Sequence, residues 1–174
     1  MTAEESGLLG SEYFAANPPL PLEQVAANIN VDGLNYLGPT KDMVQLGSDR
    51  SSLGPMLETI LKDRGRVLGQ DGHPERGYFF RSDHFPFAKA GVPALSLSEP
   101  KEFTGPNGAA LLEKQDGYTG KDYHQPSDQY DPAWDFSGGV DDLRALAQLG
   151  WRIAAQADMP KYNDGDQFAQ VRKR

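Results

Sequence analysis

The chain has 174 residues, a formal net charge of −8 and no cysteine. This length suits a single domain, and the acidic balance argues against nucleic-acid phosphates as a partner. Without cysteine, disulfides and thiolate zinc sites are excluded, so any metal must be held by carboxylates and by the histidines, which are His73, His84 and His124. No apolar run approaches the ~18 residues of a transmembrane helix, so we expect no membrane span.

The first half of the chain alternates between helical and extended patterns. Thr2 and Glu5 have the spacing of a capping box, which predicts a helix that ends before Pro18. Apolar residues recur at helical spacing between Leu53 and Leu61 and predict a second helix. The expected elements are helices over 6–16 and 53–64, a helical turn over 22–25, and strands over 26–32 and 43–47.

The second half continues this alternation, which predicts the α/β class. The expected elements are a strand over 66–68, a short helix over 83–90 with Phe87 inward and Gly91 as its stop, a buried strand over 92–97, a long glycine-rich loop over 99–122 and a helix over 138–157. The apolar stripe expected on the last helix comprises Val140, Leu143, Ala147, Trp151 and Ala154, widened by Leu146, Leu149 and Ile153. The tail from Asp158 is expected to be packed or frayed coil, with the basic residues 172–174 solvated rather than bound to nucleic acid.

Three segments contain side chains that could carry chemistry. Glu4 and Glu5 could simply cap a helix, but neighbouring carboxylates can also divide the work of metal ligand and general base. Asp32, at the end of a strand, could be a turn residue or a ligand at the carboxyl edge of the sheet, where α/β sites lie. His124, in a loop, could be solvated, or it could be a zinc ligand oriented by a nearby carboxylate.

The other two histidines give weaker signals. Ser82-Asp83-His84 is compatible with an ordinary helix N-cap. His73 lies between Gly72 and Pro74, and we expect it to be a surface residue without a role in the site.

Taken together, four separated motifs give a specific pattern. They are Thr-Ala-Glu-Glu-Ser-Gly-Leu-Leu-Gly-Ser at 2–11, Asn-x-Asp-Gly at 30–33, Arg-Ser-Asp-His-Phe-x-Phe-Ala-Lys-Ala-Gly-Val-Pro-Ala-Leu at 81–95 and Tyr-His-x-x-x-Asp at 123–128. Their order and gaps resemble the M28 family of zinc peptidases over residues 2 to 155. The resemblance implies a mixed central sheet flanked by helices and an exopeptidase with two zinc ions, usually an aminopeptidase that acts on peptides with a free amino terminus.

The resemblance also assigns roles to individual residues. Glu4 matches the general base, Glu5 and His124 match ligands of one zinc, and Asp32 matches a ligand of the other. Tyr123 matches a position whose hydroxyl, in some aminopeptidases of the family, helps to polarise the scissile carbonyl. The segment around Ser82 matches one near the active site, so Asp83 and His84, together with Asp128, are expected to line or support the site.

Two ligands of the family have no counterpart here, namely a His in a His-x-Asp motif and a bridging Asp, both upstream of the Glu-Glu pair. The resemblance therefore implies that residues 1–157 are the carboxyl-terminal portion of a catalytic domain, with 158–174 as a tail and with amino-terminal strands missing. We expect such a chain to be inactive alone, because catalytic zinc normally has three protein ligands. The missing amino-terminal portion would then be its partner.

Other functions stay open at this stage. Related scaffolds include carboxypeptidases, single-zinc glutaminyl cyclases, and receptor or interaction domains that have lost metal ligands. Retention of Glu4, Glu5, Asp32 and His124 favours the hydrolase, although the cyclase is also compatible with this set. Members of the family are commonly exported, so we expect a secreted or periplasmic protein, although this chain contains no signal segment.

Overall fold

The computed structural model describes residues 1–171, so the basic run at 172–174 lies outside the described residues. The fold is α/β, as predicted, with a four-stranded mixed sheet in the order β1-β4-β2-β3. The strands are β1 (Asn28–Asn30), β2 (Asp42–Leu46), β3 (Val67–Gly69) and β4 (Ala94–Ser98). β4 pairs with β1 in parallel and with β2 in antiparallel orientation, while β2 and β3 run parallel.

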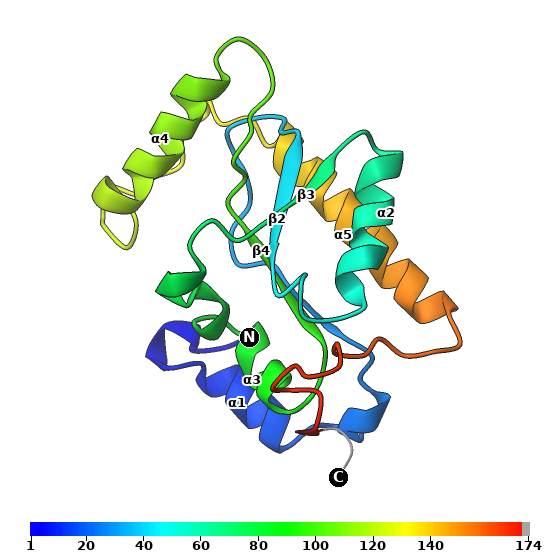
Figure 1. The fold of residues 1–174 in the computed structure, drawn as a ribbon. Helices are drawn as coiled ribbons and strands as arrows, with labels where there is room; N and C mark the ends of the chain where they lie inside the picture. Colours follow the sequence, from blue (N-terminus) through cyan, green and yellow to red (C-terminus); the bar gives the residue numbers. More distant parts are fainter. Residues whose placement is uncertain (172–174) are drawn as a thin grey trace.

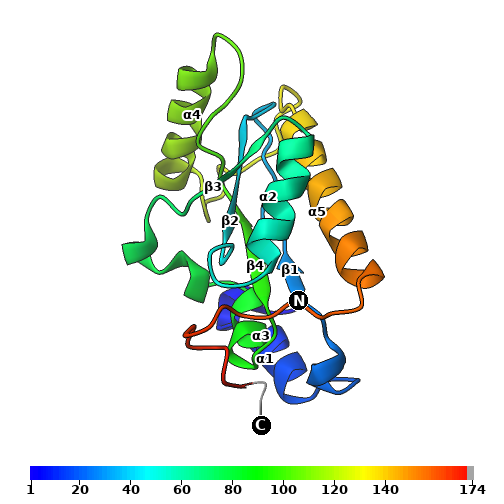
Figure 2. The ribbon, with the colours of Figure 1, turned by 45° about the vertical axis from the view of Figure 1, so that its right-hand side comes forward.

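Helices surround this sheet on several sides (Figure 1). They are α1 (Leu9–Ala16), α2 (Leu53–Asp63), α3 (His84–Lys89), α4 (Gly108–Lys121) and α5 (Ser137–Ala155), with short 3-10 turns at Glu4–Ser6, Leu22–Gln24, Pro74–Arg76 and Tyr78–Phe80. Both ribbon views show α2 and α5 packed side by side, α1 and α3 together near one end of the sheet, and α4 standing apart (Figures 1 and 2). None of the helices in residues 1–171 is long and apolar enough to cross a membrane.

The main hydrophobic core lies between the sheet and the α2–α5 pair. Its buried members are Met43, Leu53, Leu57, Ile60, Leu61, Leu95, Leu97, Ala145, Leu146, Leu149 and Ile153. β2 and β4 occupy the middle of the sheet, so their residues are buried almost throughout, whereas the edge strand β1 is only half-buried. The predicted helix at 53–64 and the buried strand at 92–97 are therefore confirmed, with shifts of one or two residues at their ends.

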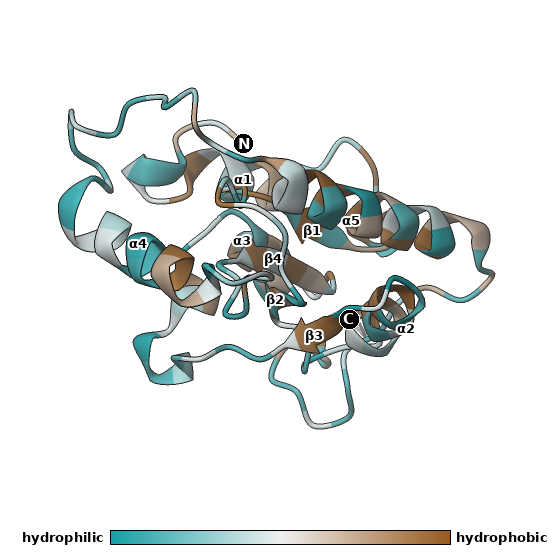
Figure 3. Ribbon diagram, turned by 90° about the horizontal axis from the view of Figure 1, so that it is seen from above, coloured by the Kyte–Doolittle hydropathy of each residue, from teal (hydrophilic) through white to brown (hydrophobic). Residues whose placement is uncertain are grey.

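The prediction of which face of α5 is buried is wrong for the residues expected at the centre of the apolar stripe. Val140 and Leu143 are exposed, and Trp151 is 76% exposed. The buried face instead runs through Leu146 and Leu149, which the sequence placed only at the margin of the stripe. Figure 3 shows the cause of the ambiguity, since hydrophobic residues recur along most of α5 and α2 covers only one of its sides.

Two other local predictions are also wrong. No capping box forms at Thr2, because Ala3 takes the position before the first turn, with no side-chain cap and a left-handed φ of 57°. The first α-helix accordingly begins at Leu9 rather than at residue 6. The segment 99–122, predicted as loop, contains the 14-residue helix α4. The prediction was wrong because glycine has a low helix propensity and this segment contains several glycines.

Candidate metal and catalytic site

Glu4 and Glu5 lie in a tight turn at the start of the chain. The residues on either side of this turn, Ala3 and Leu8, both have left-handed backbone conformations, with φ of 57° and 61°. The turn is tied to α1, because the Gly10 amide donates a 2.9 Å hydrogen bond to the Thr2 carbonyl. A Cβ at Gly10 would lie 2.4 Å from that oxygen, so only glycine allows this approach.

His124 is brought to this turn from the loop that follows α4. Its Nε2 lies 2.8 Å from Oε1 of Glu5, and both side chains are more than half exposed. His124 itself has a left-handed φ of 60°, an uncommon conformation for a residue with a Cβ. Its ring stacks on Tyr123 with centroids 3.9 Å apart. The structure thus joins an imidazole nitrogen and a carboxylate oxygen from two distant segments.

Asp32 follows β1 and is held by a small hydrogen-bond network. Ser82 donates its hydroxyl to Oδ2 of Asp32 over 3.3 Å, and Asn30 donates its amide to the Ser82 oxygen over 2.9 Å. Asn30 also lies 3.3 Å from the hydroxyl of Ser96 on the neighbouring strand β4. The sequence placed Asn30 and Ser82 only within motifs, with Ser82 as part of a possible helix cap, and did not predict that they hold Asp32. The two-residue spacing between Asn30 and Asp32 could have suggested their proximity, because it places both on one face of the predicted strand 26–32.

Electrostatics show that these carboxylates share one region. Desolvation raises the pKa of Glu4, and the negative charges of Asp32, Glu5 and Asp83 raise it further. Desolvation also raises the pKa of the Tyr123 phenol, with contributions from Glu5 and Asp32. Glu4, Glu5, Asp32 and Tyr123 therefore lie close enough to influence one another.

The three supporting candidates occupy different places. Asp83 is buried and acts on Glu4 electrostatically. His84 is fully buried against the ring of Phe79, with which it makes an edge contact at 4.8 Å, so its side chain belongs to the interior. Asp128 lies beside the site, where it accepts a 2.9 Å hydrogen bond from the hydroxyl of Tyr118.

The donor atoms fit zinc in kind but fall short in number. Imidazole nitrogen and carboxylate oxygen are ordinary zinc ligands, and Glu5 and His124 already converge. Within residues 1–171, however, no group of three or more His, Asp or Glu side chains is arranged to hold a metal ion. A catalytic zinc commonly takes three protein ligands, so each metal of a complete site needs donors in addition to these.

The turn with paired glutamates, the histidine that meets it and the aspartate that follows β1 thus lie near one another at one end of an α/β sheet. The sequence matches the model of Peptidase family M28 over residues 1–145, and the chain belongs to this family, which is generally zinc-dependent. It is also 28% identical to leupeptin-inactivating enzyme 1 of Streptomyces exfoliatus over 178 residues. That alignment covers 97% of this chain and 37% of the Streptomyces protein, so the chain spans little more than a third of this relative. No solved structure matches the chain significantly.

Proposed function

We propose that the chain supplies part of the active site of a zinc-dependent aminopeptidase. The observation that carries the proposal is the contact between Nε2 of His124 and Oε1 of Glu5, with Glu4 adjacent in the same turn. Glu5 and His124 would hold one zinc, and Asp32 would be a ligand of the other. Zinc at this place would supply Lewis acidity, which lowers the pKa of a bound water toward ~7 and polarises a carbonyl.

The protein groups divide the remaining work. Glu4 accepts the proton of the attacking water and passes it to the leaving amine. The hydroxyl of Tyr123 donates a hydrogen bond to the oxygen on which negative charge develops. Asn30 and Ser82 keep Asp32 in position through their hydrogen bonds, as outer partners of metal ligands do elsewhere.

The choice of an aminopeptidase over a carboxypeptidase rests on the motif resemblance. Glu4, Glu5, Asp32 and Tyr123 match positions that family aminopeptidases use. The local carboxylates do not decide this choice, because the charge of bound zinc ions would offset that of Glu5 and Asp32.

The 174-residue chain by itself is expected to have little activity. Its own residues provide Glu5 and His124 for one zinc and Asp32 for the other, which leaves both coordination spheres incomplete. Complete coordination would require further ligands, and the family resemblance implies a His in a His-x-Asp motif and a bridging Asp for this role. A His-x-Asp motif followed by a Gly/Ala-Asp segment, encoded immediately before Thr2, would agree with this assignment. An exported location also stays a prediction.

Zinc titration of the chain by calorimetry tests the site directly. We expect weak zinc binding that falls at least about tenfold in Glu5→Gln and in His124→Ala, since each removes one of few ligands. His73→Ala is the matched control, because His73 is an exposed histidine paired only locally with Glu75. Equal zinc affinity in all three variants would contradict the assignment of these ligands.

A leucyl-anilide assay of the same preparations tests the reaction. Negligible turnover by the chain alone is expected, and turnover by a protein that also carries the upstream residues should be lost in Glu4→Gln. Tight binding of two zinc ions with normal turnover by the chain alone would overturn the incomplete-site proposal. A longer protein that binds no zinc and has no activity would favour a non-catalytic interaction domain, and one tightly bound zinc with cyclase turnover would favour a glutaminyl cyclase.

A further inference from the structure

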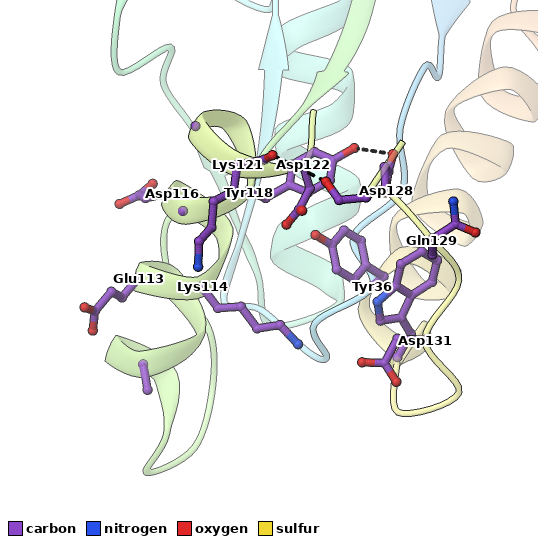
Figure 4. A pocket seen from close by; sticks show the side chains of 15 residues that line it. Tyr36, Glu113, Lys114, Asp116, Tyr118, Lys121, Asp122, Asp128, Gln129 and Asp131 are labelled. Atoms are coloured by element: carbon purple, nitrogen blue, oxygen red, sulfur yellow. Dashed lines mark hydrogen bonds between the residues drawn. The ribbon is translucent and has the colours of Figure 1, made fainter. Parts of the chain in front are cut away.

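A hollow of about 860 Å³ lies between α4, the loop 127–134 and Tyr36. Its volume falls in the range of small-molecule and side-chain binding sites. Figure 4 shows Tyr36 in the middle of this hollow, with Tyr118 on the α4 side. Asp128 is the residue of this lining that was expected near the site, and the α4 part of the lining falls in segment 99–122, which was expected to be an irregular loop.

The hollow has an aromatic wall. Tyr36 lies against Trp134 with ring centroids 4.7 Å apart, and Tyr118 meets Tyr36 edge-on at 6.2 Å. The backbone fixes this arrangement, because the Asp135 amide donates to the Tyr36 carbonyl and the Gly38 amide donates to the Asp135 carbonyl, both over 2.9 Å. Tyr36 and Trp134 therefore form a preformed surface of the type that attracts cations through the faces of aromatic rings.

Carboxylates outnumber cations around this wall. The charged residues that line the hollow are Glu113, Asp116, Asp122, Asp128 and Asp131, against Lys114 and Lys121. In Figure 4 the side chains of Asp122, Asp128 and Asp131 lie around Tyr36, whereas Glu113 and Asp116 point away from it. The side chain of Lys114 extends into the hollow toward Asp131. The ammonium group of Lys114 would therefore compete with a ligand cation in this hollow.

The aromatic wall continues directly to the proposed zinc ligands. Tyr118 meets Tyr123 edge-on at 6.1 Å, and Tyr123 stacks on His124, whose Nε2 contacts Glu5. Centroid separations of 3.9, 6.1 and 6.2 Å lead from His124 through Tyr123 and Tyr118 to Tyr36. A peptide with its amino terminus near Glu4 and Glu5 would therefore reach the hollow with a residue further along its chain, since each extended residue spans about 3.3–3.6 Å.

We propose that the hollow beside Tyr36 and Trp134 binds the cationic side chain of an arginine or lysine residue in a peptide substrate. Stacking on Tyr36 and Trp134 holds the stem and the charged head, and Asp128 and Asp131 supply the opposite charge. This inference rests on the proposed peptidase function, since it identifies the class of substrate for that site. Binding in the hollow itself needs neither metal nor turnover, so it can be tested separately.

The test is a fluorescence titration of the whole chain in a metal-free buffer. The chain has two tryptophans, and Trp151 is 76% exposed, so Trp151→Phe leaves Trp134 as the only reporter. The probes are N-acetyl-lysine amide and N-acetyl-norleucine amide, which share the aliphatic stem but differ in the ammonium group. Acetylation removes the α-amino charge, so the proposed zinc site does not contribute.

We expect a saturable change in Trp134 emission with the lysine amide and an affinity at least about tenfold above that of norleucine amide, equivalent to ~1.4 kcal/mol. Added salt should reduce this difference, because the charges of the hollow are partly exposed. Equal affinity for both amides, or no saturable response to the lysine amide, would overturn the proposal.

Three variants in the Trp151→Phe background identify the groups that bind. Asp131→Asn should weaken binding of the lysine amide several-fold, and its Oδ1 can still accept the hydrogen bond from the Ala133 amide that shapes the loop. Lys114→Met should strengthen binding, since it removes a competing cation. Asp116→Asn is the matched control, because it removes the same charge from a side chain that points away, and it should have no effect. Unchanged affinity in both Asp131→Asn and Lys114→Met would contradict the assigned position.

Discussion

The Nε2 atom of His124 lies 2.8 Å from Oε1 of Glu5, which joins the first turn of the chain to the loop after α4. The first turn is tied to α1 by the hydrogen bond from Gly10 to Thr2, and the backbone is left-handed at Ala3, Leu8 and His124. Such conformations cost about 1–2 kcal/mol each, so the surrounding contacts must hold them in place. The geometry of the site therefore depends on the residues that fasten these two segments.

Gly10 is the residue that fastens the first turn. In Gly10→Ala, the new Cβ would collide with the Thr2 backbone, so the turn that carries Glu4 and Glu5 must move. We expect the weak zinc binding of the chain to fall at least about fivefold, as measured by calorimetry. Gly150→Ala is the matched control in α5, where a Cβ meets nothing within 4 Å, and it should stabilise the fold by about 0.5–1 kcal/mol without changing zinc binding.

The substitution Ala3→Gly is expected to stabilise the fold. Its φ of 57° is strained for a residue with a Cβ, and its side chain is exposed, so Ala3→Gly relieves strain without loss of packing. We expect stabilisation of up to about 1 kcal/mol in urea unfolding. Ala147→Gly, at an exposed position within α5, should instead destabilise by about 1 kcal/mol. A loss of stability in Ala3→Gly would show that its left-handed conformation carries little strain.

Arg66 is a buried cation that neutralises the carboxylates on α5. It lies 2.7 Å from Asp142 and 3.0 Å from Asp141, and its guanidinium also donates to Thr40 over 2.8 Å. In Arg66→Met, the nearly buried Asp142 loses this partner, and we expect a loss of about 3–5 kcal/mol in unfolding free energy. Arg66→Met combined with Asp142→Leu should recover much of this loss. A double variant as unstable as the single variant would contradict the charge-based explanation.

His84 makes the fold sensitive to mild acid. Burial lowers the pKa of His84 from 6.5 to about 4, against weaker opposing effects of the Phe79 backbone and Asp83. The unfolded chain therefore binds a proton below pH 6.5 that the folded chain takes up only near pH 4. The contribution of His84 to the free energy of unfolding is therefore fully present above pH 6.5. It decreases as the pH falls from 6.5 toward 4, and the free energy of unfolding drops by about 2 kcal/mol between pH 7 and pH 5.

Comparison with two histidine variants isolates this contribution. In His84→Leu, urea unfolding at pH 7 and pH 5 should show a pH dependence smaller by about 2 kcal/mol. His73→Gln changes an exposed histidine and should retain the full dependence. Identical pH dependence in His84→Leu and the unchanged chain would rule out His84 as the source.

Much of the local structure follows from the sequence because it is encoded over short distances. The helical spacing of Leu53, Leu57 and Ile60 predicts α2, and the apolar run around Leu95 predicts β4. Both predictions hold because a helix and a buried strand, respectively, bring these apolar side chains into the core. The candidate ligands also follow from the sequence. In a chain without cysteine, Glu5, Asp32 and His124 are recognised by residue type and motif order.

Other features depend on contacts between segments that are far apart in the chain. Which face of α5 is buried depends on α2, because Trp151 and Leu149 are both apolar and only the position of the neighbouring helix decides between them. In the same way, the left-handed Ala3 replaces a capping box because the turn is held by α1 through Gly10. The sequence by itself thus determined the strands, most of the helices and the chemistry of the candidate site. Tertiary packing alone decided which atoms meet, because the contact of His124 with Glu5 and that of Tyr36 with Trp134 each join segments that no local pattern relates.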